Sequence, residues 1–302
     1  MTLDQLRIFV AVAEQEHLTR AANALALSQS AVSSSIAALE DRYDVKLFDR
    51  IGRNIALTAA GRVFLAEAQA VLARAASAQS VLADLAGLRR GALSVAASQT
   101  VANYWLPGVM HRFHANHPGI ELTLSIANTE QVVRKVDDGT VDLGFIEDQV
   151  EVGGLAVFPV AKDQLTLVVA PDHPWAVFDS IPADADLRDS AWVLREPGSG
   201  TRGIFEKSVK SLGIDPASLP IVLQLSSNEA VRSAVEAGAG ATVLSRLVVE
   251  SSIRLGTLKA LSWPLPERDF LMLRNEQRHA SEAMRAFCAL ALTYRDQSIG
   301  SP

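Results

Sequence analysis

The sequence SQSAVSSSI at residues 28–36 lies between two short amphipathic segments and a stretch that predicts an arginine-bearing hairpin. Within it, Val32 and Ile36 repeat at helical spacing and are followed by Leu39, so that one face of the segment is apolar. Ser28 precedes this face and belongs to the residue types that favour an N-cap. The pattern predicts a helix that begins at Ser28, runs to about residue 42 and buries its apolar face.

Two helices are predicted before this one. Residues 3–16 carry apolar side chains at helical spacing, namely Leu3, Leu6, Phe9, Val10 and Ala13. Thr19 is the candidate N-cap of a second helix, in which the small residues Ala21 and Ala22 would allow a close helix crossing. With a turn at residues 27–28, these three helices have the order of a helix-turn-helix.

The exposed face of the third helix carries short polar side chains in its first turns: Gln29, Ser30, Ser33 and Ser34. A helix that lies in the major groove presents its N-terminal residues to base edges. Glutamine can pair with adenine through two hydrogen bonds, and serine can donate to or accept from several bases. These four residues are therefore candidates for reading DNA. The alternative is a solvated helix start.

Residues 46–58 predict a two-stranded wing with its turn at Gly52. Four apolar residues would pack the wing on the helices, namely Leu47, Phe48, Ile55 and Leu57. Arg50 and Arg53 stand near the tip, where they would suit a phosphate or a narrow minor groove. The alternative is a solvated hairpin with two unrelated arginines.

Together these features resemble the winged helix-turn-helix of LysR-type transcriptional regulators. The matching residues are Ser28-Gln29, Ala31-Val32-Ser33, Ile36, Leu39-Glu40, Leu47-Phe48, Arg50, Leu57-Thr58 and Gly61. The family's layout covers essentially the whole chain. Ser30 stands where the family often has proline, and Ser34 and Ser35 stand where it often has arginine and glutamine. The resemblance therefore implies the mode of docking on DNA but not the operator sequence.

Residues 1–62 contain seven basic and seven acidic residues, so their formal charges cancel. Attraction to DNA must then come from the placement of the arginines, from helix N-termini and from the doubling of heads in a dimer. We expect a modest affinity for each head and a salt-sensitive complex.

The whole chain has 302 residues, enough for two or three domains, and a net charge of −6, which argues against a membrane surface or bulk RNA as partner. Cys288 is the single cysteine, so no intramolecular disulfide can form, and its place in a helical pattern predicts a buried structural thiol. Neither a signal peptide nor an apolar run of membrane-spanning length is visible. A cytoplasmic protein is therefore expected.

Residues 59–88 predict one long helix without proline. Apolar residues recur along it at spacings of four and three, namely Phe64, Ala68, Val71, Ala75, Ala78, Leu82 and Leu85. This seam favours a dimerisation helix that holds two DNA-binding heads apart, and such a dimer would read a partly palindromic operator. The alternative is a helix that packs on its own domain.

From residue 92 onward, predicted strands alternate with helices. Strands at 92–97, 120–126 and 141–146 enclose helices at 103–116 and 130–138, and this βαβαβ order implies a parallel sheet. A second lobe would contain strands near 164–170, 192–194, 221–225 and 241–244. A strand at 268–273 and a helix at 281–295 would return to the first lobe.

The expected fold class is therefore multidomain. An all-α winged helix-turn-helix DNA-binding domain (1–58) and a linker helix (59–88) precede an α/β effector-binding domain (91–302). Lobe I of that domain would comprise residues 91–162 and 265–302, and lobe II residues 163–264. The LysR-type resemblance implies that this two-lobed domain is similar to periplasmic solute-binding proteins.

Polar clusters fall where these strands give way to helices. The candidate effector-binding residues are Ser98, Gln99, Thr100, Asn128, Thr129, Glu147, Ser199, Thr201, Arg202 and Asn228. Helix N-termini offer free N–H groups and partial positive charge, hydroxyls beside them can complete an anion pocket, and Arg202 would add a cation. The expected effector is a small oxyanion or anionic metabolite in the cleft between the lobes. Each cluster, taken singly, would also serve as an N-cap.

Glu147 does not suit a pure anion, because an ionised carboxylate would repel it. It would instead bind a hydroxyl or an amine of the ligand, or pair with Arg202.

The string REPGSGTR at residues 195–202, with Ala97-Ser98 and Asn103-Tyr104 upstream, resembles the LysR-type branch of sulfur-assimilation and carbon-dioxide-fixation regulators. Effectors of that kind would be sulfite, sulfate, a phosphorylated sugar or a nucleotide cofactor. The family resemblance also implies a homotetramer and contact with RNA polymerase.

Sequence motifs for catalysis are missing: there is no phosphate-loop pattern, no HExxH pair and no GxSxG elbow. His111, His114 and His117 recur every three residues before Pro118, which indicates a helix surface rather than a metal site. No enzyme, metal or cofactor is expected. Two functions remain: a sequence-specific transcriptional regulator controlled by a small effector, or an architectural DNA-binding protein whose C-terminal lobes serve only assembly.

Overall fold

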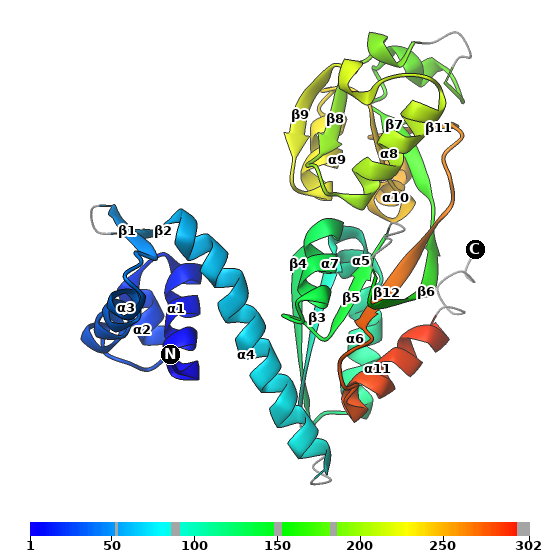
Figure 1. The fold of residues 1–302 in the computed structure, drawn as a ribbon. Coiled ribbons are helices and arrows are strands. Elements are labelled where there is room, and N and C mark those ends of the chain that lie inside the picture. Colours follow the sequence, from blue (N-terminus) through cyan, green and yellow to red (C-terminus); the bar gives the residue numbers. More distant parts are fainter. Residues whose placement is uncertain (52–53, 86–90, 148–152, 182–185, 295–302) are drawn as a thin grey trace. The chain divides into compact units, whose positions relative to one another are not determined.

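The N-terminal part of the chain begins with three helices, α1 (Leu3–Gln15), α2 (Leu18–Ala24) and α3 (Gln29–Tyr43). A hairpin of β1 (Phe48–Ile51) and β2 (Asn54–Leu57) follows, and then the long helix α4 (Ala59–Leu85). These elements come from a computed structural model, which describes residues 1–51, 54–85, 91–147, 153–181 and 186–294. The chain divides near Leu82 into two compact units, whose elements are labelled in Figure 1.

The start of the third helix is confirmed, whereas that of the second is corrected. The Ser28 hydroxyl accepts a hydrogen bond from the N–H of Ala31 at 3.2 Å, as an N-cap does. The N-cap of α2 is His17 rather than Thr19, because the His17 Nδ1 accepts from the N–H of Thr19 at 3.2 Å. A neutral imidazole has one acceptor nitrogen and can replace the usual hydroxyl. The Thr19 hydroxyl donates instead to Gln29 Oε1.

The three helices and the hairpin share one apolar core. Leu6 and Phe9 of α1, Ala21 and Ala22 of α2, and Val32, Ile36 and Leu39 of α3 lie in it as predicted, and Leu47 and Ile55 bring the hairpin onto the helices. Leu3, which the predicted face of α1 included, is instead 40% exposed. Phe64 and Ala68, the first two positions of the seam in α4, also belong to this core, and the Phe64 ring packs on Phe9 at 4.8 Å. The alternative of packing on its own domain therefore holds for the first turns of α4. Further along, Val71 and Leu82 are exposed.

The first lobe of the C-terminal unit is built on a five-stranded sheet in the order β4-β3-β5-β12-β6. Its strands are β3 (Gly91–Ser98), β4 (Ile120–Ala127), β5 (Leu143–Ile146), β6 (Leu155–Asp163) and β12 (Arg268–Asn275). Strands β4, β3 and β5 are parallel, as the βαβαβ order predicts. Strand β12 runs antiparallel to both β5 and β6.

The helices of this lobe are α5 (Gln99–Tyr104), α6 (Leu106–Asn116), α7 (Thr129–Asp137) and α11 (Glu282–Thr293). The single helix expected over 103–116 is therefore wrong. Two helices meet at Trp105, because Pro107 stands in the first turn of α6 and a proline there favours a new helix start.

Strand β6 is not predicted by the sequence pattern, since Pro159 stands in its middle. A proline cannot donate to a ladder and is found in edge strands or at bulges. Strand β6 satisfies both conditions. It is an edge of the sheet, and its register against β12 shifts between Ala161 and Pro159.

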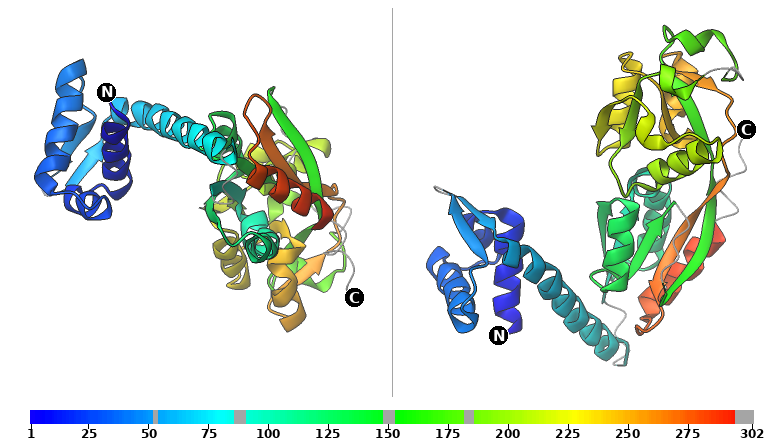
Figure 2. Two further views of the ribbon diagram at one scale, coloured as in Figure 1. Left: turned by 90° about the horizontal axis from the view of Figure 1, so that it is seen from below. Right: turned by 45° about the horizontal axis from the view of Figure 1, so that its top comes forward.

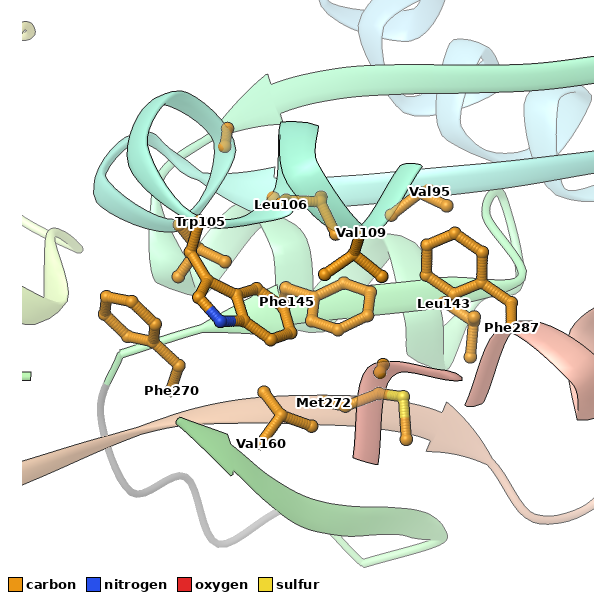
Figure 3. Packing of buried hydrophobic residues seen from close by; sticks show 14 of the residues in the cluster. Val95, Trp105, Leu106, Val109, Leu143, Phe145, Val160, Phe270, Met272 and Phe287 are labelled. Atoms are coloured by element: carbon orange, nitrogen blue, oxygen red, sulfur yellow. The ribbon is translucent and has the colours of Figure 1, made fainter. Parts of the chain in front are cut away.

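Apolar layers cover both faces of the sheet. One face packs against α5, α6 and α11 around Trp105, Phe145, Met272 and Phe287, as Figure 3 shows. The other packs against Val132 and Val136 of α7.

Cys288 of α11 packs at the margin of the first layer and is half-buried rather than fully buried. Burial raises the pKa of this thiol to about 11, so it stays protonated at neutral pH, as a structural cysteine does.

The second lobe begins at β7 (Leu165–Val169), the centre of a sheet in the order β10-β7-β11. Strands β10 (Thr242–Ser245) and β11 (Lys259–Leu261) flank it, and β8 (Trp192–Arg195) pairs in parallel with β9 (Ile221–Leu225). The helices are α8 (Gly200–Ser211), α9 (Asn228–Glu236) and α10 (Arg246–Leu255), with short 3-10 turns at 174–177, 187–189 and 216–218. Helix α10 and strand β11 were not predicted.

Two segments cross between the lobes. Strand β6 leads into β7, and β12 returns from the second lobe beside β6, as both views in Figure 2 show. Within the described ranges, no helix combines the length and the apolar character that a membrane span requires.

Candidate DNA interface and effector site

The start of α3 presents its polar side chains at the surface. Gln29, Ser30 and Ser34 are exposed and Ser33 is half-buried. These side chains make few hydrogen bonds. Gln29 Oε1 accepts from the Thr19 hydroxyl at 3.2 Å, and the hydroxyls of Ser28 and Ser30 lie 3.0 Å apart. Side chains held this loosely remain able to exchange these partners for base edges. The side chain of Arg50 and the whole of Arg53 lie outside the described residues.

A buried carboxylate links α3 to the wing. Glu40 Oε1 accepts from the N–H groups of Leu47 at 2.8 Å and Phe48 at 3.2 Å, and Oε2 pairs with Lys46 at 2.8 Å. Glu40 stands on the buried side of α3 and is 8% exposed. In the sequence, Glu40 is part of the family motif and has no structural role assigned to it. A glutamate in line with the apolar face of a predicted helix is the signal that could have shown its structural role.

The other side of the wing is fastened by Thr58. Its N–H donates to the carbonyl of Leu47 at 3.0 Å, and its hydroxyl donates to the carbonyl of Lys46 at 2.8 Å. Gly61 lies against the same segment, where a Cβ atom would overlap the Leu47 carbonyl oxygen. The close approach of α4 to the wing therefore explains why Thr58 and Gly61 of the family motif are needed at these positions.

Four of the candidate effector residues form a hydrogen-bonded group that joins the lobes. The buried Thr100 hydroxyl donates to Glu147 Oε1 at 3.1 Å, and Asn228 Nδ2 donates to Thr100 Oγ1 at 3.1 Å. Gln99 joins the same helix start, since its Oε1 accepts from the N–H of Asn228 at 2.9 Å. The sequence places these residues on three separate segments, and the fold brings them together.

Arg195, which is not among the candidate residues predicted from the sequence, completes this group. Its guanidinium donates to Asn228 Oδ1 and forms an ion pair with Glu196 at 2.8 Å, although it is only 4% exposed. An arginine at the end of a predicted buried strand could have drawn attention to it, because an arginine is almost never fully buried unless it is paired.

A second group lies where α8 begins. The Thr129 hydroxyl accepts from the N–H of Gly200 at 3.2 Å, and the Asn128 amide lies 3.5 Å from the carbonyl of Pro197. Beside them is an open cavity of about 630 Å³, and its lining includes Thr129, Ser199 and Arg202. Three of the ten candidates therefore line one cavity.

Arg202 does not pair with Glu147, contrary to one of the two roles expected for that carboxylate. Its guanidinium pairs with Glu206 at 2.7 Å and donates to the carbonyl of Arg195 and to Gln224 Oε1. Since a carboxylate already balances the charge of Arg202, this residue offers the cavity less positive charge than the sequence suggested.

Thr201 belongs to a third group, at the crossing of the two lobes. Arg268 donates to the Thr201 hydroxyl at 3.1 Å and forms a buried ion pair with Asp163 at 2.6 Å. Ser245 donates to the same carboxylate at 2.6 Å. Arg268 and Asp163 face each other across β12 and β6, so this pair holds the two crossing strands together.

The alternative of simple N-capping holds for some of the clusters. Asn128 Oδ1 accepts from the N–H of Gln131, and the Ser227 hydroxyl accepts from the N–H of Ala230, as caps do. Ser98 and Ser199 also stand at N-cap positions, but neither side chain makes a capping hydrogen bond. Their hydroxyls remain for another partner.

His111 and His114 lie on α6, and His117 is the C-cap of this helix. Among the described residues, no group of three His, Cys, Asp or Glu side chains is placed to hold a metal ion. The rings of His117 and Phe113 stack at 4.6 Å, which accounts for one of the three histidines.

A winged three-helix domain with a polar helix start, in one chain with a two-lobed α/β domain that has polar groups between its lobes, defines an effector-controlled DNA-binding regulator. Residues 3–62 match the family described as bacterial regulatory helix-turn-helix protein, lysR family, and residues 86–295 match the LysR substrate binding domain. The chain belongs to the LysR family of transcriptional regulators.

Two relatives span nearly the whole chain. The RuBisCO operon transcriptional regulator of Allochromatium vinosum is 36% identical over 307 residues, covering 96% of this chain and 99% of its own length. The Escherichia coli K12 protein named uncharacterized HTH-type transcriptional regulator YeiE is 34% identical over 290 residues, covering 95% and 96%. The first relative supports the resemblance to the carbon-dioxide-fixation branch.

Among solved structures, the regulatory domain of Synechocystis PCC6803 CcmR in complex with 2-PG superimposes with a TM-score of 0.63 at 27% identity. The match covers 69% of this chain and 99% of the CcmR chain. These relatives are regulators of transcription, and the family is not enzymatic.

Proposed function

We propose that residues 1–58 read an operator through the start of α3. Gln29, Ser30, Ser33 and Ser34 would contact base edges, and Arg50 and Arg53 of the wing would contact phosphates or the minor groove. The exposure of Gln29, Ser30 and Ser34 supports this proposal, as does the single hydrogen bond from Thr19 to the Gln29 side chain. Because the charges of the head cancel, base contacts and correct placement must supply much of the affinity.

The effector that controls this binding would be a small anion held between the lobes of residues 91–302. The observation that carries this proposal is the pair of hydroxyls, Ser98 and Ser199, which stand at helix starts without capping them. Ser199 lines the cavity at the N-terminus of α8, a helix of 12 residues, where N–H groups and the helix dipole favour negative charge. The CcmR regulatory domain, bound to 2-PG in its structure, also supports this choice of ligand class.

Thermal unfolding of the full chain tests the effector. All four tryptophans, Trp105, Trp175, Trp192 and Trp263, lie in the C-terminal unit, so tryptophan fluorescence follows that unit alone. We expect one of a panel of phosphorylated sugars, phosphorylated acids, nucleotides and inorganic oxyanions to raise the melting temperature and to alter the footprint on a selected operator.

The variants Ser199→Ala and Arg202→Ala should reduce this shift, whereas Gln29→Ala should keep it and weaken discrimination between operators by about 1–3 kcal/mol for each lost base contact. If no anion in the panel moved either readout, the proposed effector class would be wrong.

Residues 59–88 would form the dimer, and two dimers the tetramer. The exposed seam residues Val71 and Leu82 support this assignment. So does an apolar hollow of about 540 Å³ in the N-terminal unit, lined among others by Met1, Tyr43 and Val63. A contact with RNA polymerase and a cytoplasmic location would follow for a regulator that works on the chromosome.

A further inference from the structure

Glu147, at the end of β5, has one carboxylate oxygen that the fold leaves unused. The residue is 2% exposed. Its Oε1 accepts from the Thr100 hydroxyl, whereas Oε2 is buried and has no hydrogen-bond partner among the described residues. Ser98, at the end of the adjacent parallel strand β3, also has a buried hydroxyl oxygen without a partner. Two unsatisfied polar atoms therefore stand at neighbouring strand ends in the proposed effector site.

An ionised carboxylate only accepts hydrogen bonds, so Oε2 requires a donor. Leaving a buried polar atom without one costs free energy, and the cost is larger when the group is charged. The nearby cations do not meet this need, because Arg195 pairs with Glu196 and Arg202 pairs with Glu206. A molecule that enters the site can supply the missing donor.

The same carboxylate would repel a fully ionised anion. An acid that keeps one proton, or an anion with a hydroxyl or ammonium group, avoids this repulsion by donating to Oε2. Ser98 has both a donor and acceptor sites and can hydrogen-bond to the ionised part of the same ligand.

We propose that the effector is a small anion with a hydrogen-bond donor of its own, and that Glu147 selects it by accepting that hydrogen bond. This inference rests on the proposed effector function of the cleft and narrows its ligand class. It separates anions that keep a proton or carry a hydroxyl or ammonium group from anions that have no hydrogen-bond donor.

Inorganic phosphate and sulfate provide matched probes, because both are tetrahedral oxyanions but only phosphate keeps a proton near neutral pH. Their dissociation constants are measured on the full chain by tryptophan-detected thermal shift at pH 6.5 and constant ionic strength. The wild-type chain should bind phosphate at least about tenfold more tightly than sulfate, since like charges placed together disfavour the wrong ligand. Glu147→Gln should remove or invert this ratio, because the amide can donate to sulfate.

Glu130→Gln serves as the control, since Glu130 lines the cavity beside Ser199 and its carboxylate pairs with Arg134. It should change the two affinities by the same factor and leave their ratio intact. The proposal is overturned if wild-type protein binds sulfate as well as phosphate, if it binds neither, or if Glu147→Gln keeps the wild-type ratio. Should that variant not fold, the wild-type ratio decides alone. Binding of sulfate in preference to phosphate would leave the proposed anion site standing while removing this selection.

Discussion

At the scale of single residues, Glu40 links helix α3 to the wing through three hydrogen bonds. Burial by itself would raise the pKa of its carboxyl, but the hydrogen bonds from Lys46, Leu47 and Phe48 outweigh burial and lower the pKa below its ordinary value. A carboxyl whose pKa falls on folding stabilises the fold above its unfolded pKa. That stability is lost as the pH falls through the folded pKa.

Glu40→Gln should therefore destabilise the head at pH 7, by roughly 1–2 kcal/mol, because a neutral amide accepts the same N–H groups more weakly. The difference between wild type and variant should shrink as the pH falls through the lowered pKa of the folded state, because the wild-type carboxyl then becomes protonated as well. Denaturation followed by far-UV circular dichroism measures both. Asp41→Asn, a change at the exposed neighbouring residue, should show neither effect. Equal stability of Glu40→Gln and wild type at pH 7 would contradict this account.

Gly61 is required by space rather than by backbone conformation. A methyl group there would overlap the Leu47 carbonyl oxygen, a backbone atom that cannot rotate away. Gly61→Ala should lower the stability of the head by about 1–3 kcal/mol through overpacking and should weaken operator binding. Gly153→Ala is the matched control, since a Cβ atom at Gly153 meets nothing within 4 Å. Equal melting of the two variants by circular dichroism would refute the steric argument.

At the scale of elements, helix starts divide into those that use their capping side chain and those that do not. Ser28, Ser227, Ser245 and Ser281 accept from backbone N–H groups of their own helices. Ser98 and Ser199 occupy the same position in α5 and α8 without that hydrogen bond. The same residue type at the same position is thus structural in one helix and available for a ligand in another.

The difference between a capping and a non-capping serine can be measured, without an effector, as a difference in the free energy of unfolding. Ser227→Ala removes a used cap and should cost about 1 kcal/mol, whereas Ser199→Ala should stay within about 0.5 kcal/mol of wild type. Tryptophan fluorescence during urea unfolding compares the two on the same unit. If Ser199→Ala cost as much as Ser227→Ala, the Ser199 hydroxyl would be acting as a cap.

The crossing strands depend on a buried charge pair. The side chains of Arg268 and Asp163 are 3% and 1% exposed, and they tie β12 to β6. Arg268→Met should cost roughly 3–5 kcal/mol, because it leaves the Asp163 carboxylate buried without its cation. Changing both partners, Arg268→Met with Asp163→Leu, should recover much of that loss in the same urea assay. A double variant no more stable than the single one would show that the charge itself is not the cause.

At the scale of the whole molecule, the seam of α4 serves two purposes. Its first positions, Phe64 and Ala68, lie in the core of their own head, while Val71 and Leu82 remain at the surface. A helix that is anchored at one end and apolar further along suits pairing with a second copy.

Leu82→Glu should therefore shift the protein toward monomer in sedimentation and lower operator affinity, because the avidity of paired heads is lost. Gln79→Glu adds a negative charge at an exposed position off the seam and should leave the assembly intact. Unchanged sedimentation of Leu82→Glu would place the dimer contact elsewhere.

Much of the fold could be predicted where local spacing and tertiary packing agree. The apolar faces of α1 and α3, the cap at Ser28 and the three parallel strands of lobe I follow from periods of 3.6 and 2. Strand β6 was not predicted, because a proline at position 159 argues against a strand. The sheet tolerates Pro159 because β6 is an edge strand. The roles of Arg195 and Arg268 were not predicted, because each depends on a partner that is distant in the sequence. Asn228 lies 33 residues from Arg195, and Thr201 lies 67 residues from Arg268.

The sequence by itself determined the class of the protein, because a long family motif and helical periods are local properties of the chain. It also determined which polar residues stand at strand ends. Only the tertiary structure decided which of them meet, which cap a helix and which keep a free atom. Those distinctions depend on contacts between residues far apart in the chain, such as Thr100 with Asn228, and no local pattern contains them.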